Sequence, residues 1–367
     1  MKSILICGSR GYPAHYGGFE TLTQELAELW SNEGHRITVT GFSNKGSERV
    51  VFKTEPKVEI ATIAVEYSGW SRLANIFATF KATRQACKLY SFDGAIVLNG
   101  ANFFTALYLQ ARRGFPVLVH LDGDESARRG IPWPGRVLHW FMRLASLIFI
   151  DKIVIDSRAL LRRIPRKFYK KVRVIKYGFA DVSTDRKVMS RNFPELQAGY
   201  FLNVARLVPE NNVAEIMESY LSSKRRVPLV ILGKGTGPKR YESRLEDLAL
   251  KAPEKILLLK AQYDTQKLCT LIESSSLYIH GHEAGGTNPI LVTARQFASK
   301  LISHSNVYNR EDCRSDEMFW SNVSELRTVM DSESLFQSRR DTAITAKDST
   351  ESWEEIADQY LELLFAT

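Results

Sequence analysis

Two glycine-rich segments of the sequence have the composition of an anion-binding turn. Residues 8–21 follow the apolar run 4–6 and have the sequence GSRGYPAHYGGFET, and residues 281–289 follow 277–280 and have the sequence GHEAGGTNP. Glycines between a strand and a helix bring backbone N–H groups close to an anion, and the helix dipole adds to the attraction. Each segment is also compatible with an ordinary turn that uses glycine only for a positive φ.

The second segment carries a clear signal for the start of a helix. Pro289 stands where a first helical residue would, after Thr287 and Asn288, which are residue types that cap helices. Gly285 and Gly286 leave the neighbouring amides open, and the Thr287 hydroxyl and Asn288 carboxamide can donate hydrogen bonds. We expect this helix N-terminus to bind a diphosphate, with an ordinary capped helix as the alternative.

Two strand ends between these segments add candidate residues. Arg206 follows a strand expected at 200–204, at the edge of the sheet where a guanidinium can bind phosphate through two hydrogen bonds. Considered alone, such an arginine is also a common surface ion-pair partner. Gly233 follows the strand expected at 228–232, in a turn without Walker spacing. The first segment lacks the G-x-G-x-x-G fingerprint, which disfavours a nicotinamide dehydrogenase.

Short apolar strands alternate with helical segments along the chain, as in parallel sheets built from βαβ units. The expected strands are residues 3–7, 37–41, 59–64, 94–98, 116–120, 152–155, 172–176, 200–204, 228–232, 255–259, 276–280 and 300–303. Helical spacing is clear at 20–33 and 213–222. The α/β pattern runs twice, so we expect domains at 1–178 and 200–345, joined by a linker at 179–199. A terminal helix within 346–367 is expected to pack back on the first domain.

Composition and charge bound the class of protein. The 367 residues are 44% apolar and 25% charged, which excludes a disordered or fibrous chain. The net charge of +9 is uneven, because residues 1–180 hold 27 basic and 14 acidic residues while residues 181–367 hold 23 and 27. The four cysteines show no CxxC spacing, and the longest apolar run, 144–150, broken only by Ser146, is too short to span a bilayer. We expect a cytoplasmic protein.

Together these segments resemble a glycosyltransferase of the GT-B architecture and, more narrowly, the bacterial rhamnosyltransferase-like branch of glycosyltransferase family 4. The motifs are R-G-x-P-x-x-Y-G-G-F-E-T at residues 10–21, D-G-x-E at 122–125, R-L-x-P-E-N-N at 206–212, Y-D at 263–264, H-G-H-x-x-G-G-T-N-P at 280–289 and, with tyrosine in place of phenylalanine, F-N-R-E at 308–311.

The resemblance implies two Rossmann-like domains with parallel sheets facing a cleft. The second domain would bind a nucleoside diphosphate sugar, which is a substrate, and the first would receive the acceptor. The reaction would retain the anomeric configuration and need neither a metal nor another cofactor. The implied catalytic residues are Arg206, Gly286, Thr287 and Asn288; the donor-binding residues are Gly17, Gly18, Arg206, Asn211, Gly233, Glu283, Gly285, Gly286, Thr287 and Thr293; and the acceptor-side residues are Tyr16, His120, Asp122 and Glu125.

Thr293 departs from the family pattern, which usually has a glutamate there that grips the donor ribose. Threonine offers one neutral contact, and losing a charge-assisted hydrogen bond costs on the order of 1.5–3 kcal/mol. Glu283 lies at the same rim and is a candidate substitute. Three interpretations follow: an active enzyme with a re-anchored donor, an altered donor, or a catalytically silent protein that acts as a binding or scaffold subunit. A sugar-phosphate-binding Rossmann protein of other chemistry is a remoter alternative.

Basic residues gather late in the first half of the chain. Residues 162–176 hold eight lysines and arginines and no acid, and upstream arginines are interleaved with Trp133, Trp140 and Phe141. Basic and aromatic residues together suit an anionic membrane surface, here residues 128–176. A solvated charged face is the alternative. Nucleic-acid binding is disfavoured, because the sequence has no recognisable nucleic-acid-binding module. The resemblance favours the membrane, so we predict transfer of a hexose or a rhamnose-like deoxyhexose to a glycan or lipid-linked acceptor in cell-surface polysaccharide synthesis, at the inner face of the membrane.

Overall fold

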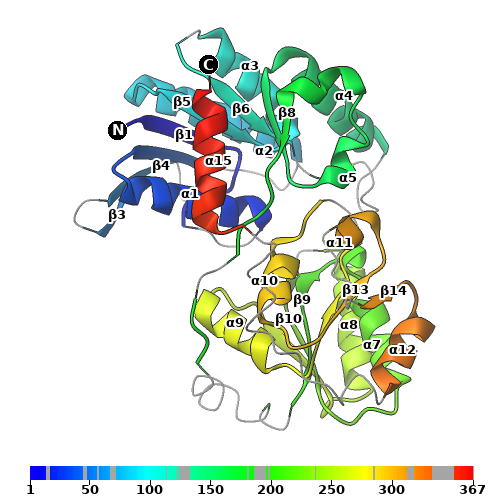
Figure 1. Ribbon diagram of the computed structural model, residues 1–367. Helices are drawn as coiled ribbons and strands as arrows, with labels where there is room; N and C mark the ends of the chain where they lie inside the picture. The colour runs from blue at the N-terminus through cyan, green and yellow to red at the C-terminus, as the bar shows by residue number, and fades with distance from the viewer. Residues whose placement is uncertain are drawn as a thin grey trace. The chain divides into compact units, whose positions relative to one another are not determined.

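The chain forms two compact units (Figure 1). The computed structural model describes residues 1–13, 17–43, 48–55, 58–66, 72–112, 114–121, 123, 133–179, 182–185, 196, 199–235, 237–283, 286–311, 318–332 and 351–366. The first unit contains the described residues up to Gly178 and those from Glu351 onward, and the second contains the described residues from Phe179 to 332.

The first unit is built on an eight-stranded sheet with the order β3-β4-β2-β1-β5-β6-β7-β8. Its strands are β1 (Ser3–Cys7), β2 (Arg36–Ser43), β3 (Glu48–Glu55), β4 (Val58–Glu66), β5 (Gly94–Leu98), β6 (Val117–His120), β7 (Lys152–Ile155) and β8 (Val172–Val174). All pairings are parallel except that of β3 with β4. Each strand expected in this half is present, and β3 is an addition. It is an edge strand whose few apolar residues stand among charged ones, so its sequence gives little periodic signal.

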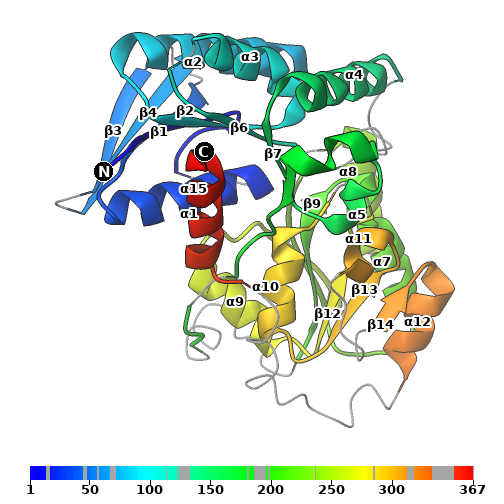
Figure 2. The same ribbon diagram turned by 45° about the horizontal axis from the view of Figure 1, so that its top comes forward.

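Helices cover this sheet (Figures 1 and 2). They are α1 (Gly18–Asn32), α2 (Arg72–Leu89), α3 (Phe103–Ala111), α4 (Trp133–Phe149), α5 (Arg158–Leu161) and α15 (Trp353–Phe365), with 3-10 turns η1 (Gly100–Asn102) and η3 (Arg166–Lys171). Within the described residues, no helix combines the length and the apolar character needed to cross a membrane.

The second unit is built on a six-stranded sheet with the order β11-β10-β9-β12-β13-β14, parallel throughout. Its strands are β9 (Phe201–Leu207), β10 (Leu229–Gly235), β11 (Ile256–Lys260), β12 (Leu277–His280), β13 (Leu301–His304) and β14 (Met318–Trp320). Its helices are η5 (Pro209–Asn211), α7 (Val213–Leu221), α8 (Lys239–Leu250), α9 (Thr265–Ser274), α10 (Pro289–Phe297), α11 (Val307–Glu311) and α12 (Val323–Asp331). The unpredicted β14 has three residues, too few for a periodic pattern.

Alternation along the strands builds one core on each face of the second sheet. Phe201 and Ile231 point to the face covered by α7, α8 and α12, and Leu202, Val230 and Tyr278 point to the face covered by α9 and α10 (Figure 1). This alternation also fixes the face on which every later residue of each strand lies.

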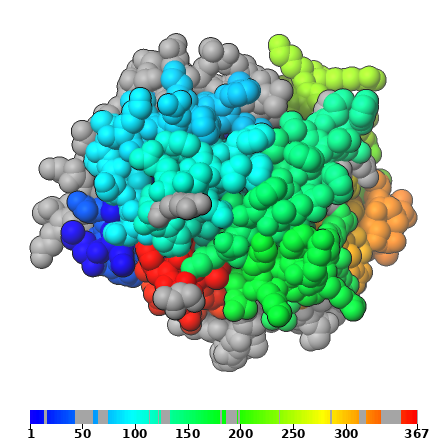
Figure 3. All heavy atoms as spheres, turned by 90° about the horizontal axis from the view of Figure 1, so that it is seen from above, coloured from blue at the N-terminus to red at the C-terminus, as the bar shows by residue number. Residues whose placement is uncertain are grey.

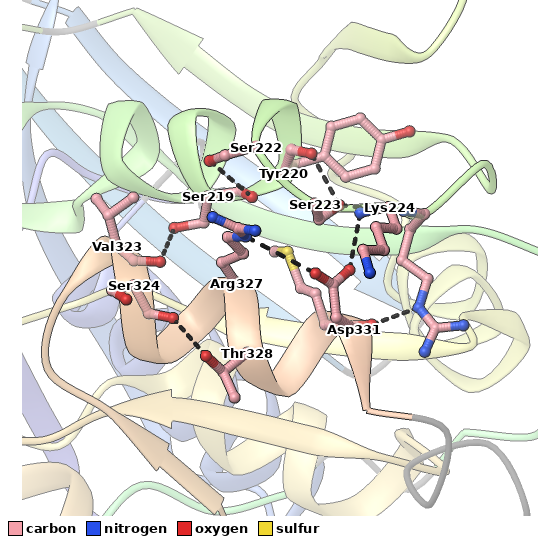
Figure 4. Close-up of polar contacts among 12 residues, drawn as sticks. Ser219, Tyr220, Ser222, Ser223, Lys224, Val323, Ser324, Arg327, Thr328 and Asp331 are labelled. Atoms are coloured by element: carbon pink, nitrogen blue, oxygen red, sulfur yellow. Dashed lines mark hydrogen bonds and ion pairs between the residues drawn. The ribbon is translucent and has the colours of Figure 1, made fainter.

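Polar contacts fasten α12 to α7 (Figure 4). The Ser219 hydroxyl donates to the carbonyl of Val323 at 3.1 Å, and the Lys224 amide donates to Asp331 Oδ1 at 2.8 Å. The Arg225 guanidinium adds bonds to the carbonyls of Met330 and Ser332. Within the described residues, α12 is therefore tied along its length to α7 and to the segment that follows α7.

The terminal helix α15 belongs to the first unit, beside α1 (Figures 1 and 2). The Tyr360 hydroxyl is hydrogen-bonded to His120 Nδ1 at 2.8 Å, and Lys152 Nζ donates to the carbonyls of Leu364 (3.0 Å) and Ala366 (2.5 Å). The lysine therefore satisfies carbonyls that the end of α15 leaves open.

Glu25 makes the packing of α1 against α15 sensitive to pH. Its pKa is raised to about 7 by burial and by the nearby charges of Glu28 and of Glu354 on α15. A carboxyl group whose pKa is higher in the folded than in the unfolded protein destabilises the fold when it is ionised. Its penalty is thus present above pH 7 and disappears as the pH falls toward the unfolded value.

We expect Glu25→Gln to raise the free energy of unfolding of the first unit at pH 8 by about 1–3 kcal/mol and to change it little near the unfolded pKa of a glutamate. Chemical denaturation at both pH values measures the difference. Glu33→Gln, at the exposed end of α1, is the control. An equal effect of Glu25→Gln at both pH values would contradict the titration.

Candidate anion site at the strand ends of the second unit

The predicted donor residues of the second unit gather where its strand order reverses. Strand β9 comes first along the chain and lies between β10 and β12, and open α/β sheets bind ligands outside the carboxyl ends of strands at such a point. The β9–β12 ladder covers only Phe201–Leu277 and Leu202–Tyr278, whereas the β9–β10 ladder continues to Leu207–Gly235. Beyond Leu202, side chains join the two strands, beginning with Asn203 Nδ2, which donates to the Ile279 carbonyl at 2.7 Å.

Asn211 and Asn212 hold the segment after β9 against the segment after β12. Asn211 Nδ2 donates to the Arg206 carbonyl at 2.8 Å, and its Oδ1 accepts from His282 Nδ1 at 2.8 Å. Asn212 adopts a left-handed backbone (φ 51°), which asparagine tolerates, and its Nδ2 donates to the Gly281 carbonyl at 2.9 Å and to Glu283 Oε2 at 3.2 Å. Asn211 is buried and hydrogen-bonded through both its nitrogen and its oxygen, so its side chain positions His282 against the backbone of Arg206.

The same contacts explain two further residues of the second glycine segment. A Cβ on Gly281 would lie 2.2 Å from the Asn211 carbonyl oxygen, so only glycine allows this approach. The His282 carbonyl accepts from Asn306 Nδ2 and Asn309 Nδ2, both at 2.9 Å, which links the site to the segment after β13. Sequence reasoning passed over His282, Asn306 and Asn309 as site-building residues, because their partners lie far along the chain.

Arg206 and Lys234 place two cations side by side at this edge. They are opposite each other in the β9–β10 ladder, which puts their Cβ atoms about 5 Å apart. Alternation from Leu202 and Val230 puts both side chains on the face that α9 and α10 cover. No Asp or Glu of the described chain forms an ion pair with either residue. Like charges repel at this distance, so the pair is suited to an anion.

Gly233 keeps this part of the ladder closed. A Cβ there would lie 2.1 Å from the Ala205 carbonyl oxygen, so its backbone packs directly against β9. The predicted donor-binding role of Gly233 therefore stands beside a clear structural role. Lys234, which sequence reasoning did not select, occupies the sixth position of β10 just as Arg206 occupies the sixth position of β9. That equivalence was the signal available in the sequence.

Helix α10 begins at Pro289 with Asn288 as its N-cap, as the sequence predicts. The Asn288 side chain accepts from the Ile290 amide at 3.1 Å, and its carbonyl accepts from the Leu291 amide at 2.9 Å. These bonds use the first N–H groups of the helix, so an anion here would meet the partial positive charge of the helix and the amides of Gly286 and Thr287. Gly286 is buried, and Gly285 lies outside the described residues.

Thr293 bonds within its own helix. Its Oγ1 donates to the Pro289 carbonyl at 3.1 Å, which leaves the oxygen able only to accept from a ribose hydroxyl. Glu283, the suggested substitute, accepts from Asn212 and is half-buried. Neither residue reproduces a free carboxylate on this helix.

His280 ends β12 beneath the site and stays neutral. Burial, together with the charges of Arg295 and His304, lowers its pKa to about 3. Both ring nitrogens are buried without a hydrogen-bond partner in the described part of the chain. His280 is therefore unsuited to proton transfer near neutral pH. Among the residues that the structure describes, no group of three His, Cys, Asp or Glu side chains is placed to hold a metal ion.

The first glycine segment uses its helix N-terminus for a carboxylate of the chain itself. Gly17 (φ 135°) is the N-cap of α1, and a Cβ there would lie 2.0 Å from Glu20 Oε2. Glu20 folds back to accept from the Arg10 amide at 3.3 Å. The carboxylate occupies the place that the first turn of α1 offers to an anion. Gly18 is the first residue of α1.

The acceptor-side residues are only partly described. Tyr16, Asp122 and Glu125 lie outside the described residues. His120 is 1% exposed, bonded to Tyr360 and in edge-to-face contact with Phe19 at 5.1 Å. Its predicted contact with the transferred sugar gains no support from this geometry, because α15 covers the ring.

We expect Asn211→Ala to lower the free energy of unfolding of the second unit by about 1–3 kcal/mol, because His282 and the Arg206 carbonyl lose buried hydrogen bonds. Denaturation followed by Trp320, which is buried in this unit, measures the change. The control is Gln266→Ala, which removes an amide of similar size from the surface and should change stability by at most about 0.5 kcal/mol. Equal losses in the two variants would remove the positioning role of Asn211.

Comparison with known proteins places this geometry in a fold class. Residues 17–178 match the family model for a glycosyl transferase 4-like domain, and no curated protein matches the chain. Sucrose-phosphate synthase from Thermosynechococcus elongatus superimposes with a TM-score of 0.80 at 15% identity, over 99% of this chain and 98% of that one. HepE from Anabaena, in complex with UDP and glucose, gives 0.71 at 13% identity over 100% of both chains.

A UDP-forming trehalose-phosphate synthase from Burkholderia xenovorans, in complex with glucose-6-phosphate, gives a TM-score of 0.69 at 13% identity, over 99% of this chain and 100% of that one. Sequence identities this low establish similarity of fold only. The chain therefore has the two-unit fold of the GT-B glycosyltransferases, and residues 17–178 match the glycosyl transferase 4-like family.

Proposed function

We propose that the protein is a retaining, metal-independent glycosyltransferase that moves a hexose or deoxyhexose from a nucleoside diphosphate sugar to a glycan or lipid-linked acceptor. The observation that carries the proposal is the pairing of Arg206 with Lys234 at the strand-order reversal, without a carboxylate partner in the described chain. The fold and the match of the first unit to a glycosyl transferase 4-like domain support the same reaction class.

The two cations suit the charge that develops in such a reaction. Sugar transfer leaves a nucleoside diphosphate, and preorganised positive groups stabilise the departing phosphate most effectively. Arg206 can bind two phosphate oxygens in a planar fork, and Lys234 adds a point charge beside it. Lys234 would thereby supply a second cation beside Arg206.

The finer parts of the proposal rest on the sequence motifs. Retention and independence from metal follow from the resemblance to glycosyltransferase family 4, and a rhamnose-like sugar follows from the narrower branch. The HepE structure contains UDP, which makes a uridine donor a natural first candidate to test. Acceptor roles for Tyr16, Asp122 and Glu125 remain predictions of the same resemblance.

A lipid-linked acceptor would bring the protein to the inner face of the membrane. We include this in the proposal because residues 151–176 hold ten lysines and arginines against two aspartates. Arg162, Arg166, Lys167 and Lys170 are exposed. Exposed cations at this density attract anionic lipid headgroups.

The second candidate is a catalytically silent protein of the same fold. Thr293 carries it, since its hydroxyl is bonded inside α10 and offers the donor ribose at most one neutral contact. Such a protein would bind a nucleotide weakly or not at all and would act as a subunit of a larger assembly.

Calorimetric titration with nucleoside diphosphates and their sugar conjugates separates the two candidates. We expect the nucleoside diphosphate of one base to bind, and Lys234→Ala to weaken that binding about tenfold or more. In a separate assay of sugar transfer, Arg206→Ala should reduce turnover about a hundredfold or more. Lys251→Ala removes an equally exposed cation of the same unit and should leave binding unchanged. Binding of a nucleoside without phosphates should be the same in all variants. Loss in the control as well would show a general charge effect and reject the site.

Thr293→Glu tests the ribose contact. If the pocket has the family shape, the added carboxylate accepts from two ribose hydroxyls, and we expect donor binding to tighten about tenfold. Thr293→Gln matches the size without the charge and should gain little. Weaker or unchanged binding of Thr293→Glu would show that the donor is held elsewhere.

A further inference from the structure

Helix α4 of the first unit carries an exposed apolar stripe beside the stripe that packs inward. Its inner stripe, with Leu138, Met142 and Ala145, packs against Phe103 of α3. Its outer stripe consists of residues three or four apart, which lie on one face of a helix: Trp133, Val137, Trp140, Phe141, Leu144 and Ile148. A helix of a water-soluble domain needs only the inner stripe, so the outer one requires another explanation.

The outer stripe is open to solvent. Trp133 is 76% exposed and Trp140 is 60% exposed, Val137, Phe141 and Ile148 are about half exposed, and Leu144 is half-buried. Helix α3 packs against α4, with the rings of Phe103 and Phe149 5.9 Å apart, and adds Phe104 and Leu107 as exposed apolar side chains. We call these eight residues the α3–α4 apolar face. Figure 3 shows the segments of α3 (cyan) and α4 (blue-green) next to each other on the surface of the first unit.

Positive charge lies near this face. Helix α4 contains no acidic residue, and Arg136 lies four positions before Trp140, whereas the Arg143 guanidinium turns inward with one nitrogen buried. Lys171 Nζ is used at the end of α4, where it donates to the Ile148 and Ile150 carbonyls at 3.2 and 3.0 Å and pairs with Asp151 at 3.9 Å. The exposed cations are those of the segments that follow α4, among them Arg162, Arg166, Lys167 and Lys170. Residues 133–178 hold twelve lysines and arginines against two aspartates.

We propose that the α3–α4 apolar face docks on the surface of an anionic phospholipid bilayer, with its aromatic side chains inserted at the level of the headgroups. Tryptophan and arginine side by side are suited to that level, where one end of each side chain is apolar and the other wet. The surrounding cations supply attraction to anionic lipid.

A bilayer fits this face better than a second copy of the chain. A two-fold dimer would bring the same surface of both copies together and would oppose two sets of like charges. The inference deepens the proposed function by naming the surface at which a lipid-linked acceptor would be met. It rests on that function for the identity of the acceptor, while the docking itself needs no donor site.

Flotation with vesicles tests the docking, using equal parts of phosphatidylglycerol and phosphatidylcholine against phosphatidylcholine alone. We expect binding to the anionic vesicles and a loss of at least about tenfold in partitioning for Trp140→Ser with Phe141→Ser. Leu250→Ser, which removes an exposed leucine of the second unit, should bind like the parent protein. Added salt should weaken binding by screening without cancelling the difference between variant and parent.

Brominated lipid tests insertion independently of stability, because tryptophan fluorescence is quenched only within reach of the acyl chains. With Trp70, which lies outside the described residues, replaced by phenylalanine in parent and variant alike, quenching should disappear in Trp133→Phe with Trp140→Phe, since Trp30, Trp320 and Trp353 are buried. Equal partitioning of the serine variant and the parent would overturn the proposal. So would a dimer that the serine variant dissociates, which would make the face a contact between copies.

Failure of docking and failure of the proposed function give different results. The serine variant should bind nucleoside diphosphate as the parent does, and Arg206→Ala should bind vesicles as the parent does. Vesicle binding without any nucleotide binding would leave the docking surface in place and reject the glycosyltransferase. Nucleotide binding without vesicle binding would do the reverse.

Discussion

The early end of pairing between β9 and β12 determines the chemistry available to the second unit. After Leu202 the two strands share no further ladder pairs, and the chain segments that follow them are joined by asparagine and histidine side chains. On the other side, β9 remains paired with β10 up to its last residue, which aligns Arg206 with Lys234. A ladder that stops on one side and continues on the other thus produces both the open edge of the candidate site and its charge.

Positioning and binding are divided between residues that look alike in sequence. Asn211 and Asn212 bond to backbone carbonyls and to His282 and Glu283, whereas Asn288 uses its side-chain oxygen for the cap of α10. A carboxamide bonded through both its oxygen and its nitrogen, as in Asn211, holds a loop but has little left for a ligand. The groups at this edge that suit a departing diphosphate are the paired cations and hydrogen-bond donors such as Asn288 Nδ2.

Periodicity predicted the elements of this fold because most of its strands are buried on both faces and are bounded by turns. It did not predict β3, an edge strand among charged residues, or the three-residue β14. At the candidate anion site, local sequence predicted the start of α10 at Asn288 and Pro289, but it could not predict neighbours that strand register or a distant helix brings together. Lys234 depends on alignment with a strand 28 positions away, and His120 is covered by a helix from the end of the chain.

The first unit has another asymmetry, because its terminal helix covers one part of the sheet while α4 leaves an apolar stripe in water. On α4 itself, Met142 and Ala145 are buried against α3, which shows that apolar side chains of this helix are otherwise kept from water. Exposing a row of aromatic side chains beside them forgoes roughly 25 cal/mol for each Å² of apolar surface left in water. A fold that buries one stripe of a helix so completely and keeps large aromatic side chains exposed beside it has a surface suited to a partner that is itself apolar below a charged layer.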